Sequence, residues 1–220
     1  MLSNEEKLSN EETMELLLAL RGQGIMDNAL LNLFEATPRR VFLNASQVQS
    51  GLSPDRSAPI SCGQIQVSPL VIANIIRELD VKPDDKILEI GTGSGFQSVI
   101  LARLCRKLYT VDRFHTLINE AKLRFQALKI NNVIAQVGDG EHGWHENEAF
   151  DCIVVNAAIP SLSKALLAQL KNGGTLVAPI LQDNGLADVT IYLKSETGLE
   201  AKKISSERFL PLIPGIAKSL

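Results

Sequence analysis

The stretch that decides the fold is KILEIGTGSGF, residues 86–96. It begins as a short apolar run, KILEI at 86–90, and passes directly into a loop with a glycine at every second position. A helical pattern follows, from about Phe96 to Leu104. Alternating glycines between a strand and a helix let the backbone turn sharply, approach a ligand closely and direct the N–H groups of the helix start toward an anionic group. The stretch therefore predicts a nucleotide-binding α/β unit.

The residues that follow repeat this alternation of strand and helix. Runs of strand length lie at 107–112, 132–139, 150–156 and 173–180, with helical patterns at 117–128 and 163–170 between them. Such alternation is typical of βαβ units around a parallel sheet. The end differs, because ADVTIYLKS (187–195) and LEAKKIS (199–205) flank a Thr197-Gly198 turn with no helix between them. We therefore predict an α/β fold: a Rossmann-like, doubly wound, mostly parallel sheet with an antiparallel C-terminal hairpin.

The residues before this sheet read as helices. An apolar stripe at helical spacing lies over 11–20, and Asp27 is suited to cap a second helix at 28–36. Residues 44–68 are rich in Ser, Pro and Gly and are expected to form a loop. Ser68 and Pro69 suit the cap and the first position of a third helix. These elements predict an N-terminal helical cap on the sheet.

Composition excludes several classes of function. The 220 residues are 45% hydrophobic and 21% charged, as in ordinary soluble proteins, and the net charge of −3 favours no polyanionic partner. We therefore expect no nucleic-acid binding. No stretch approaches the roughly 18 apolar residues of a membrane span, and the N-terminus lacks the apolar core of a secretory signal. We expect a cytoplasmic protein without membrane attachment; its oligomeric state is left open by the sequence.

The cysteines and histidines do not form a metal-binding pattern. The chain has three of each, at Cys62, Cys105, Cys152, His115, His142 and His145. The cysteines are odd in number and widely spaced, and the histidines have no partnering Cys or carboxylate at metal-ligand spacing. We expect reduced thiols and no metal site.

Three details favour S-adenosylmethionine over a nicotinamide dinucleotide at the glycine loop. The dinucleotide pattern G-x-G-x-x-G needs a small residue where Phe96 stands. Glu89, two residues before the first glycine, suits a cationic ligand end such as the amino group of a methionyl moiety. Asp139, between Gly138 and Gly140 after a strand, is suited to accept a hydrogen bond from an adenine amine. Asp112 ends the second strand and suits ribose hydroxyls, which both cofactors carry.

At this point several stretches resemble one family, the protein-L-isoaspartate O-methyltransferases. The match runs in one order from about Leu20 to Leu212. It includes TPRRVF (37–42), DRSAPISCGQ (55–64), the glycine loop and its helix, GDGEHGW (138–144) and RFLPL (208–212). The GDG-x-x-G-W run and the PR-x-x-F pattern are more specific than the glycine loop alone.

The resemblance implies a single methyltransferase domain over 1–220, with the helical cap and acceptor loop in 1–80 and the cofactor-binding core in 81–220. It implies methyl transfer from S-adenosylmethionine to the α-carboxylate of L-isoaspartyl residues in damaged proteins or peptides, as a repair reaction. Carried over residue by residue, the cofactor site comprises Glu89, Gly91, Thr92, Gly93, Ser94, Gly95, Asp112, Arg113, Asp139 and Gly140.

The acceptor loop departs from the family pattern. Where the family reads G-Q-T-I-S-x-P, this chain has Gly63-Gln64-Ile65-Gln66-Val67-Ser68-Pro69. The family threonine falls on Ile65, and the serine usually treated as the active-site residue falls on Val67. A family tyrosine before the D-R pair falls on Ser53, and the family's T-A-A-x-P reads N-A-A-I-P at 156–160.

A carboxylate is already a nucleophile at neutral pH, so the reaction needs orientation rather than a general base. With no hydroxyl at positions 65 and 67, the candidates for orienting the acceptor are Gln64 and Ser68, with Gln66 beside them. Two alternatives to isoaspartyl repair stay open: a family member acting on another acceptor, and a cofactor-binding protein with little turnover. Arg39 either fastens the cap or meets an acidic substrate group, and Trp144 is expected to be a packing residue.

Overall fold

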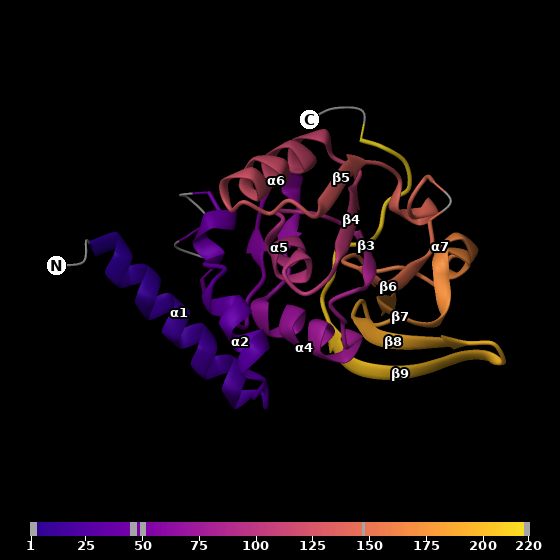
Figure 1. The fold of residues 1–220 in the computed structure, drawn as a ribbon, viewed down its shortest axis with the longest axis horizontal. Helices are drawn as coiled ribbons and strands as arrows, with labels where there is room; N and C mark the ends of the chain where they lie inside the picture. The colour runs from indigo at the N-terminus through magenta and orange to yellow at the C-terminus, as the bar shows by residue number, and fades with distance from the viewer. Residues whose placement is uncertain (1–3, 45–47, 49–51, 147, 218–220) are drawn as a thin grey trace.

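A seven-stranded sheet forms the centre of the computed structural model, which describes residues 4–44, 48, 52–146 and 148–217. The strand order is β5-β4-β3-β6-β7-β8-β9 (Figure 1). The strands are β3 (Lys86–Ile90), β4 (Lys107–Asp112), β5 (Val133–Val137), β6 (Phe150–Val155), β7 (Leu170–Leu181), β8 (Ala187–Ser195) and β9 (Gly198–Glu207). The pairs from β5 to β7 are parallel, and β7–β8 and β8–β9 are antiparallel. The predicted fold class, including the C-terminal hairpin, is confirmed.

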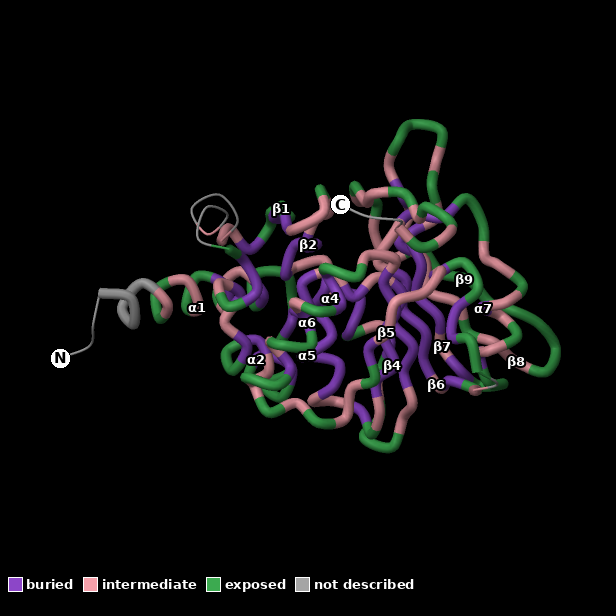
Figure 2. The backbone as a smooth tube through the Cα atoms, turned by 90° about the horizontal axis from the view of Figure 1, so that it is seen from above, coloured by how far each residue is buried: buried purple, intermediate pink, exposed green. Residues whose placement is uncertain are grey.

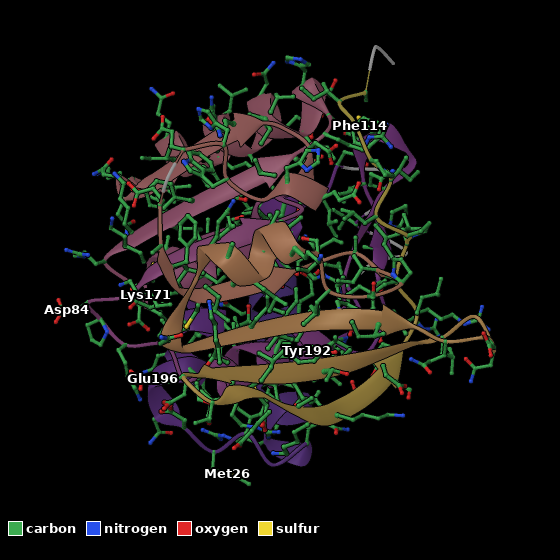
Figure 3. All side chains as sticks on the ribbon, turned by 90° about the vertical axis from the view of Figure 1, so that its right-hand side faces the viewer. Met26, Asp84, Phe114, Lys171, Tyr192 and Glu196 are labelled. Carbon is green, nitrogen blue, oxygen red and sulfur yellow. The ribbon has the colours of Figure 1, made fainter. Side chains whose placement is uncertain are left out.

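Successive residues of the strands face opposite layers of the molecule. In β3, Ile87 joins the apolar cluster under α4 (Pro69–Leu79), α5 (Phe96–Ala102) and α6 (His115–Ala127). Leu88 and Ile90 join the cluster on the other face, which includes α7 (Lys164–Gln169). Both faces are therefore covered, as a parallel sheet requires. Figure 2 shows the strands as the buried centre, and Figure 3 shows α7 beside β7, β8 and β9, with Tyr192 on β8.

The chain order creates a switch point in this sheet. The path runs outward from β3 through β4 to β5, and then returns to place β6 on the other side of β3. The connections after β3 and β6 therefore leave in opposite directions, and a crevice opens where their carboxyl ends meet. Ligands of open α/β sheets bind at such a crevice.

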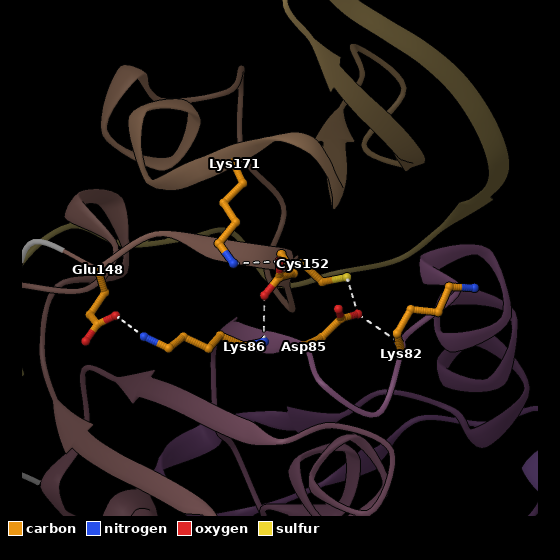
Figure 4. A network of polar contacts seen from close by, with 7 residues as sticks. Lys82, Asp85, Lys86, Glu148, Cys152 and Lys171 are labelled. Atoms are coloured by element: carbon orange, nitrogen blue, oxygen red, sulfur yellow. Dashed lines mark hydrogen bonds and ion pairs between the residues drawn. The ribbon is translucent and has the colours of Figure 1, made fainter.

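A polar network connects the amino-terminal ends of the central strands, at the end of the sheet away from the crevice (Figure 4). The Asp151 carboxylate accepts from the backbone N of Lys86 at 2.8 Å and from Lys171 Nζ at 2.7 Å. Lys86 Nζ in turn donates to Glu148 at 2.7 Å. These contacts join the amino-terminal ends of β3, β6 and β7. The crevice lies at the other ends of the strands, the carboxyl ends.

The N-terminal cap consists of α1 (Asn4–Gly22), α2 (Asn28–Glu35) and η1 (Arg39–Phe42). Asp27 Oδ1 accepts from the Ala29 backbone N at 2.8 Å, which confirms it as the cap of α2. The cap docks on α5 through Phe96, which is 1% exposed and meets the rings of Phe34 and Phe42 edge to face. Phe96, whose size disfavours a dinucleotide at the glycine loop, therefore joins the cap to the core. Within the described residues, no helix has both the length and the apolar character needed to cross a membrane.

The segment expected to be a loop, 44–68, holds more structure than predicted over its described part. Strands β1 (Ala58–Pro59) and β2 (Ile65–Gln66) pair antiparallel around the turn η2 (Ser61–Gly63). Strands of two residues are too short to show a period of two in the sequence, so the pattern could not reveal them. Residues 45–47 and 49–51 of this segment lie outside the described residues.

Arg39 fastens this segment to the cap. Its guanidinium is buried and donates to the carbonyls of Ser53 (3.0 Å) and Arg56 (2.8 Å) and to Gln66 Oε1 (2.5 Å). Burial lowers the pKa of Arg39 to about 10, so the side chain remains cationic at neutral pH. Of the two roles considered for Arg39, the structure shows the fastening one.

We expect Gly95→Ala to destabilise the fold at the start of α5. Gly95 has φ +84°, and an added Cβ would lie 2.9 Å from Phe125 Cε1 and 3.2 Å from Ala121 Cβ on α6. Left-handed strain of about 1–2 kcal/mol and overpacking of about 1–3 kcal/mol together predict a loss of about 2–5 kcal/mol in the free energy of unfolding. Urea unfolding without ligand measures this loss.

Gly24→Ala is the matched control. Gly24 has φ +80°, but an added Cβ there meets nothing within 4 Å. This variant should lose only the strain of about 1–2 kcal/mol. Equal losses in the two variants would show that the packing of α5 against α6 contributes nothing.

Candidate active site

One pocket lies at the carboxyl ends of β3, β4 and β6. It brings together three segments that are far apart in the sequence: the glycine loop, the acceptor loop and a C-terminal segment. From the ends of the strands and their loops, its lining includes Gly91, Thr92, Gly93, Ser94, Asp112, Arg113, Gly140 and Asn156. It also includes Gln64, Ile65, Gln66, Val67, Ile72, Phe96 and Gln97. Seven of the ten predicted cofactor residues therefore meet at one pocket, together with the candidate Gln64.

Asp112 holds the glycine loop in place from the end of β4. Its Oδ2 accepts from the Gly93 backbone N at 2.9 Å, and its Oδ1 accepts from the Phe114 backbone N at 3.1 Å. Burial raises the pKa of this carboxyl, against the backbone hydrogen bonds that lower it. Each carboxylate oxygen keeps a further lone pair, so Asp112 remains able to accept from hydroxyls in the pocket.

Glu89 lies behind the pocket wall rather than in it. Because side chains alternate along β3, Glu89 points under α5 and is 0% exposed. Its Oε2 accepts from the hydroxyls of Ser98 and Thr110, the latter at 2.7 Å, and its Oε1 accepts from Asn156 Nδ2 at 3.2 Å. Glu89, predicted as a cofactor residue, is therefore not among the residues that line the pocket, whereas Asn156, which donates to it, is. Burial raises the pKa of Glu89 from 4.5 to about 7, although these three hydrogen bonds lower it.

Two other predicted cofactor residues serve the walls of the pocket. Gly95 caps α5 and packs against α6. Asp139 accepts from the backbone N of Glu141 (3.0 Å) and from that of Gly215 (2.8 Å), so it ties down the C-terminal segment. Neither is among the residues that line the pocket in the described part of the chain, whereas Gly140 beside Asp139 is.

Gln66 connects the acceptor loop to the glycine loop. Its Oε1 accepts from Arg39, and its Nε2 donates to Ser94 Oγ at 2.8 Å. Gln64 lines the pocket and donates to the Cys62 carbonyl at 3.2 Å, which leaves its second amide hydrogen unused by that bond. Val67 lines the pocket with two methyl groups and is 9% exposed.

Ser68 lies outside this lining. Its hydroxyl accepts from the Val71 backbone N at 3.3 Å, which is the helix-capping role that the sequence predicts. The serine contributes instead to a neighbouring pocket with Asp55, Ser57 and Arg208. Of the two acceptor candidates, Gln64 is therefore the one placed at the cofactor loop.

Sequence reasoning missed three features of the pocket. Gln97 is 5% exposed, and its buried Nε2 has no partner among the described residues. Asn156 Oδ1 is likewise buried without a donor in the part of the chain that the structure describes. Leu210–Ile213 cover the pocket, held by Ala158 through two backbone bonds of 2.8 Å. Two features of the sequence could have indicated these residues. Gln97 is a polar residue in an apolar helix, and Asn156 stands where the family has threonine.

Trp144, expected to be a packing residue, is 3% exposed and meets Tyr109 edge to face on the α7 side of the sheet. The pocket is therefore built without the one tryptophan of the chain.

Solved structures of the same fold define the class. One described as a protein-L-isoaspartate O-methyltransferase aligns with a TM-score of 0.81 and 23% identity, over 93% of this chain and 67% of that chain. Another, described in the same terms and from Plasmodium falciparum, was solved in complex with S-adenosyl-L-homocysteine. It aligns with a TM-score of 0.76 and 22% identity, over 90% of this chain and 96% of that one. These alignments define the class by its fold: the chain has the Rossmann-like α/β fold of the two solved structures.

Sequence relatives narrow the class. The family described as Protein-L-isoaspartate(D-aspartate) O-methyltransferase (PCMT) matches residues 10–216. A Protein-L-isoaspartate O-methyltransferase from Parvibaculum lavamentivorans is 39% identical over 220 residues, covering 98% of this chain and 99% of the relative. One of the same name from a Ruegeria species is 40% identical over 205 residues, covering 93% and 95%. The chain belongs to the protein-L-isoaspartate O-methyltransferase family, whose members use S-adenosylmethionine, and the resemblance is confirmed.

We expect the stability of the ligand-free protein to fall as the pH rises from about 4.5 to about 7. In this range Glu89 ionises in the unfolded chain but stays protonated in the fold, because its pKa is raised from 4.5 to about 7. The stabilisation is complete below 4.5 and lost above about 7. At about 1.4 kcal/mol per pKa unit, the loss is roughly 3 kcal/mol.

Glu89→Gln isolates this contribution, because glutamine has the same shape without the titrating proton. The difference in unfolding free energy between wild type and variant, measured by urea unfolding from pH 4 to pH 8, should change across that interval. A difference that stays constant with pH would mean that Glu89 titrates normally.

Proposed function

We propose that this chain transfers the methyl group of S-adenosylmethionine to the α-carboxylate of an L-isoaspartyl residue in a damaged protein or peptide. The observation that carries the proposal is that one pocket joins the glycine loop at 91–94 to the acceptor loop at 64–67, in a chain that matches the family over 10–216. The Gln66–Ser94 hydrogen bond fixes the two loops relative to each other.

The pocket fits the cofactor by the polar atoms it leaves unpaired. Among the described residues, Arg113 and Asn156 line the pocket, and each has one buried polar atom without a partner, the donor Nε and the acceptor Oδ1. Asp112 retains lone pairs for ribose hydroxyls, and Gly140 with Asp139 lies on the expected adenine side. We assign the ten predicted residues to the cofactor in this sense: seven line its pocket, and Glu89, Gly95 and Asp139 hold the lining in place.

The chemistry requires little from the protein beyond orientation and exclusion of water. Bound S-adenosylmethionine supplies an electrophilic methyl group on a sulfonium. The acceptor carboxylate is ionised at neutral pH, so no residue needs to remove a proton from it. Ile65, Val67, Ile72 and Phe96 supply an apolar wall, in which charge-assisted hydrogen bonds to the carboxylate are strengthened. The amides of Gln64 and Gln97 are the donors proposed to orient it.

Val67 supports a second candidate function, methyl transfer to a different acceptor by the same fold. Valine cannot donate to a carboxylate, and Ser68, the neighbouring hydroxyl, is engaged as a helix cap. The cofactor half of the pocket is the same in both candidates, so the methyl acceptor is what distinguishes them.

The proposal takes residues 1–220 as one domain, with 1–80 as cap and acceptor loop and 81–220 as cofactor-binding core. A shared apolar cluster supports this, because it contains Leu20 and Phe34 of the cap together with Val99 and Val154 of the core. We also propose a cytoplasmic location, which the three free cysteines support. The proposed partner is the isoaspartyl protein or peptide, without nucleic acid or membrane.

We expect Asp112→Ala to weaken binding of S-adenosylhomocysteine by about 1.5–3 kcal/mol, the range for a hydrogen bond to a charged group. The variant removes the acceptor for ribose hydroxyls and releases the Gly93 backbone N. Isothermal titration measures the dissociation constant. Asp84→Ala, at an exposed turn, is the control and should bind as wild type does. An unchanged constant in folded Asp112→Ala would show that this carboxylate does not contact the cofactor.

The assay that tests the function is transfer of a labelled methyl group to an isoaspartyl peptide, compared with the matched aspartyl peptide. We expect slow transfer by the wild type. Val67→Ser should raise the rate by up to roughly 10²–10³-fold, because single donors in such sites have effects of this size. Serine places a donor at the pocket wall in exchange for the two methyl groups of the valine.

Ser68→Ala is the matched hydroxyl control. It should leave the rate unchanged and lower stability by about 1 kcal/mol through loss of the α4 cap. A fast wild type that Val67→Ser does not alter would show that the missing hydroxyl is irrelevant. Absence of transfer in all three proteins, with cofactor still bound, would favour the second candidate function.

A further inference from the structure

The turn that leads into the acceptor loop rests both on α6 and on the glycine loop. We call residues 60–65 the acceptor turn. Its first residue, Ile60, belongs to a small apolar cluster that includes Leu117 of α6. Ile60 also reaches the glycine loop, because a Cβ added to Gly93 would lie 3.3 Å from Ile60 Cδ1. Since Gln64 of the same turn lines the pocket, the position of the turn sets the position of the acceptor side of the pocket.

Two charged side chains of α6 connect the acceptor turn to the glycine loop. Ser61 Oγ donates to Glu120 Oε1 at 2.8 Å. Glu120 Oε2 accepts from Arg124 Nη2 at 3.4 Å, and Arg124 Nη1 donates to the Ser94 carbonyl at 3.1 Å. Glu120 and Arg124 are four residues apart, so they lie on the same face of the helix. The four residues Ser61, Glu120, Arg124 and Ser94 form a continuous polar chain, which we call the α6 bridge.

The α6 bridge ends on the same residue of the glycine loop that Gln66 holds. Gln66 Nε2 donates to the Ser94 hydroxyl at 2.8 Å, whereas Arg124 donates to the Ser94 carbonyl. The chain from 60 to 66 is thus tied to Ser94 twice, once directly and once through α6. One attachment would let the turn pivot about it, and the second attachment fixes its orientation.

The backbone of the acceptor turn needs such support. Cys62 has φ +63°, in the left-handed region that residues other than glycine adopt infrequently. A backbone in such a conformation persists only where the surrounding contacts hold it. The residue before Cys62 is Ser61, which bonds to Glu120. The bridge therefore reaches the turn beside its strained residue.

The two charged residues of the bridge are placed to support the site rather than to contact ligands. Among the described residues, neither Glu120 nor Arg124 lines the pocket. Their charges act on each other, on the Ser61 hydroxyl and on the Ser94 carbonyl, and hydrogen bonds with a charged partner are stronger than neutral ones. The side chains are 34% and 20% exposed, so solvent screens part of this interaction.

We propose that Glu120 and Arg124 are positioning residues for methyl transfer, which hold the acceptor turn in register with the glycine loop through Ser61 and Ser94. The inference rests on the proposed function, because it assumes a methyl donor at the glycine loop and an acceptor carboxylate beside the turn. Transfer requires the attacking oxygen and the methyl group to be aligned, and a small misplacement of one reactant lowers the rate strongly. The bridge thus contributes to the rate without touching either reactant.

Cutting the bridge at the acceptor turn tests this role. With saturating S-adenosylmethionine and isoaspartyl peptide, Ser61→Ala should lower kcat about 5- to 20-fold. This lies below the top of the roughly 10- to 100-fold range for a hydrogen bond to a charged group, because the bridge is partly exposed. By isothermal titration, the dissociation constant of S-adenosylhomocysteine should stay unchanged, since Arg124 still holds Ser94.

Two further variants are the controls. Ser61→Thr keeps the hydroxyl and should restore kcat. Asn119→Ala, at an exposed position of α6, should change neither kcat nor cofactor binding. A raised KM for the peptide with unchanged kcat in Ser61→Ala would contradict the inference, because it would show a lost binding surface instead of lost alignment. Failure of Ser61→Thr to restore kcat would contradict it as well.

A double-mutant cycle tests whether the contacts act as one chain. Ser61 and Arg124 bond to different oxygens of Glu120, so a coupling between them must pass through that carboxylate. Arg124→Met should lower kcat at saturating cofactor to a similar extent, and in the Ser61→Ala background it should add little further loss. Fully additive losses would show two independent contacts and would overturn the bridge.

The wild type separates this inference from the proposed function. If wild type methylates the isoaspartyl peptide and folded Ser61→Ala does so equally fast, the inference alone fails. If wild type binds S-adenosylhomocysteine but transfers no methyl group to the peptide, the proposed acceptor fails and the inference fails with it.

Discussion

A carboxylate shut off from water organises the centre of this protein. Glu89 accepts hydrogen bonds from α5 through Ser98, from β4 through Thr110 and from the end of β6 through Asn156. These three elements converge on the glycine loop, so one buried side chain links three of the elements that surround the pocket. A buried charge is unfavourable unless it is paired or hydrogen-bonded, and burial accordingly shifts the pKa of Glu89 to about 7. The fold thus accepts an electrostatic penalty directly beneath the glycine loop.

Much of the fold follows from local rules that single residues reveal. Asp27 and Ser68 cap their helices as their residue types predict, and the Thr197-Gly198 turn marks the hairpin of β8 and β9. These predictions succeed because a cap or a tight turn depends on a few neighbouring residues. The two-residue pair β1 and β2 was missed, because its pairing depends on contacts that leave no period in the sequence.

The site was predictable to a lesser degree, and for a physical reason. The glycine loop, Asp112 and Gly140 could be placed at the pocket because strand ends of a parallel sheet meet at one edge. Whether a side chain faces the pocket or its supporting layer depends on the pleat of the strand and on tertiary packing. Glu89 was therefore expected at the ligand although the structure places it one layer behind. Gln97 and Asn156 were not predicted because what marks them is a buried polar atom without a partner, and only the folded structure shows which atoms lack partners.

The C-terminal segment over the pocket has a consequence for the order in which the protein matures. Leu210–Ile213 form one wall, and the backbone N of Gly215 and that of Ala217 bond to Asp139 and to the Arg113 carbonyl. During synthesis these residues leave the ribosome after all seven strands of the sheet. A ligand that needs the closed pocket cannot stabilise a nascent sheet, since binding stabilises only the state that contains the site. Until the segment 210–217 has been synthesised, the sheet can be stabilised only by its own apolar clusters, and a ligand of the complete pocket adds to its stability only afterwards.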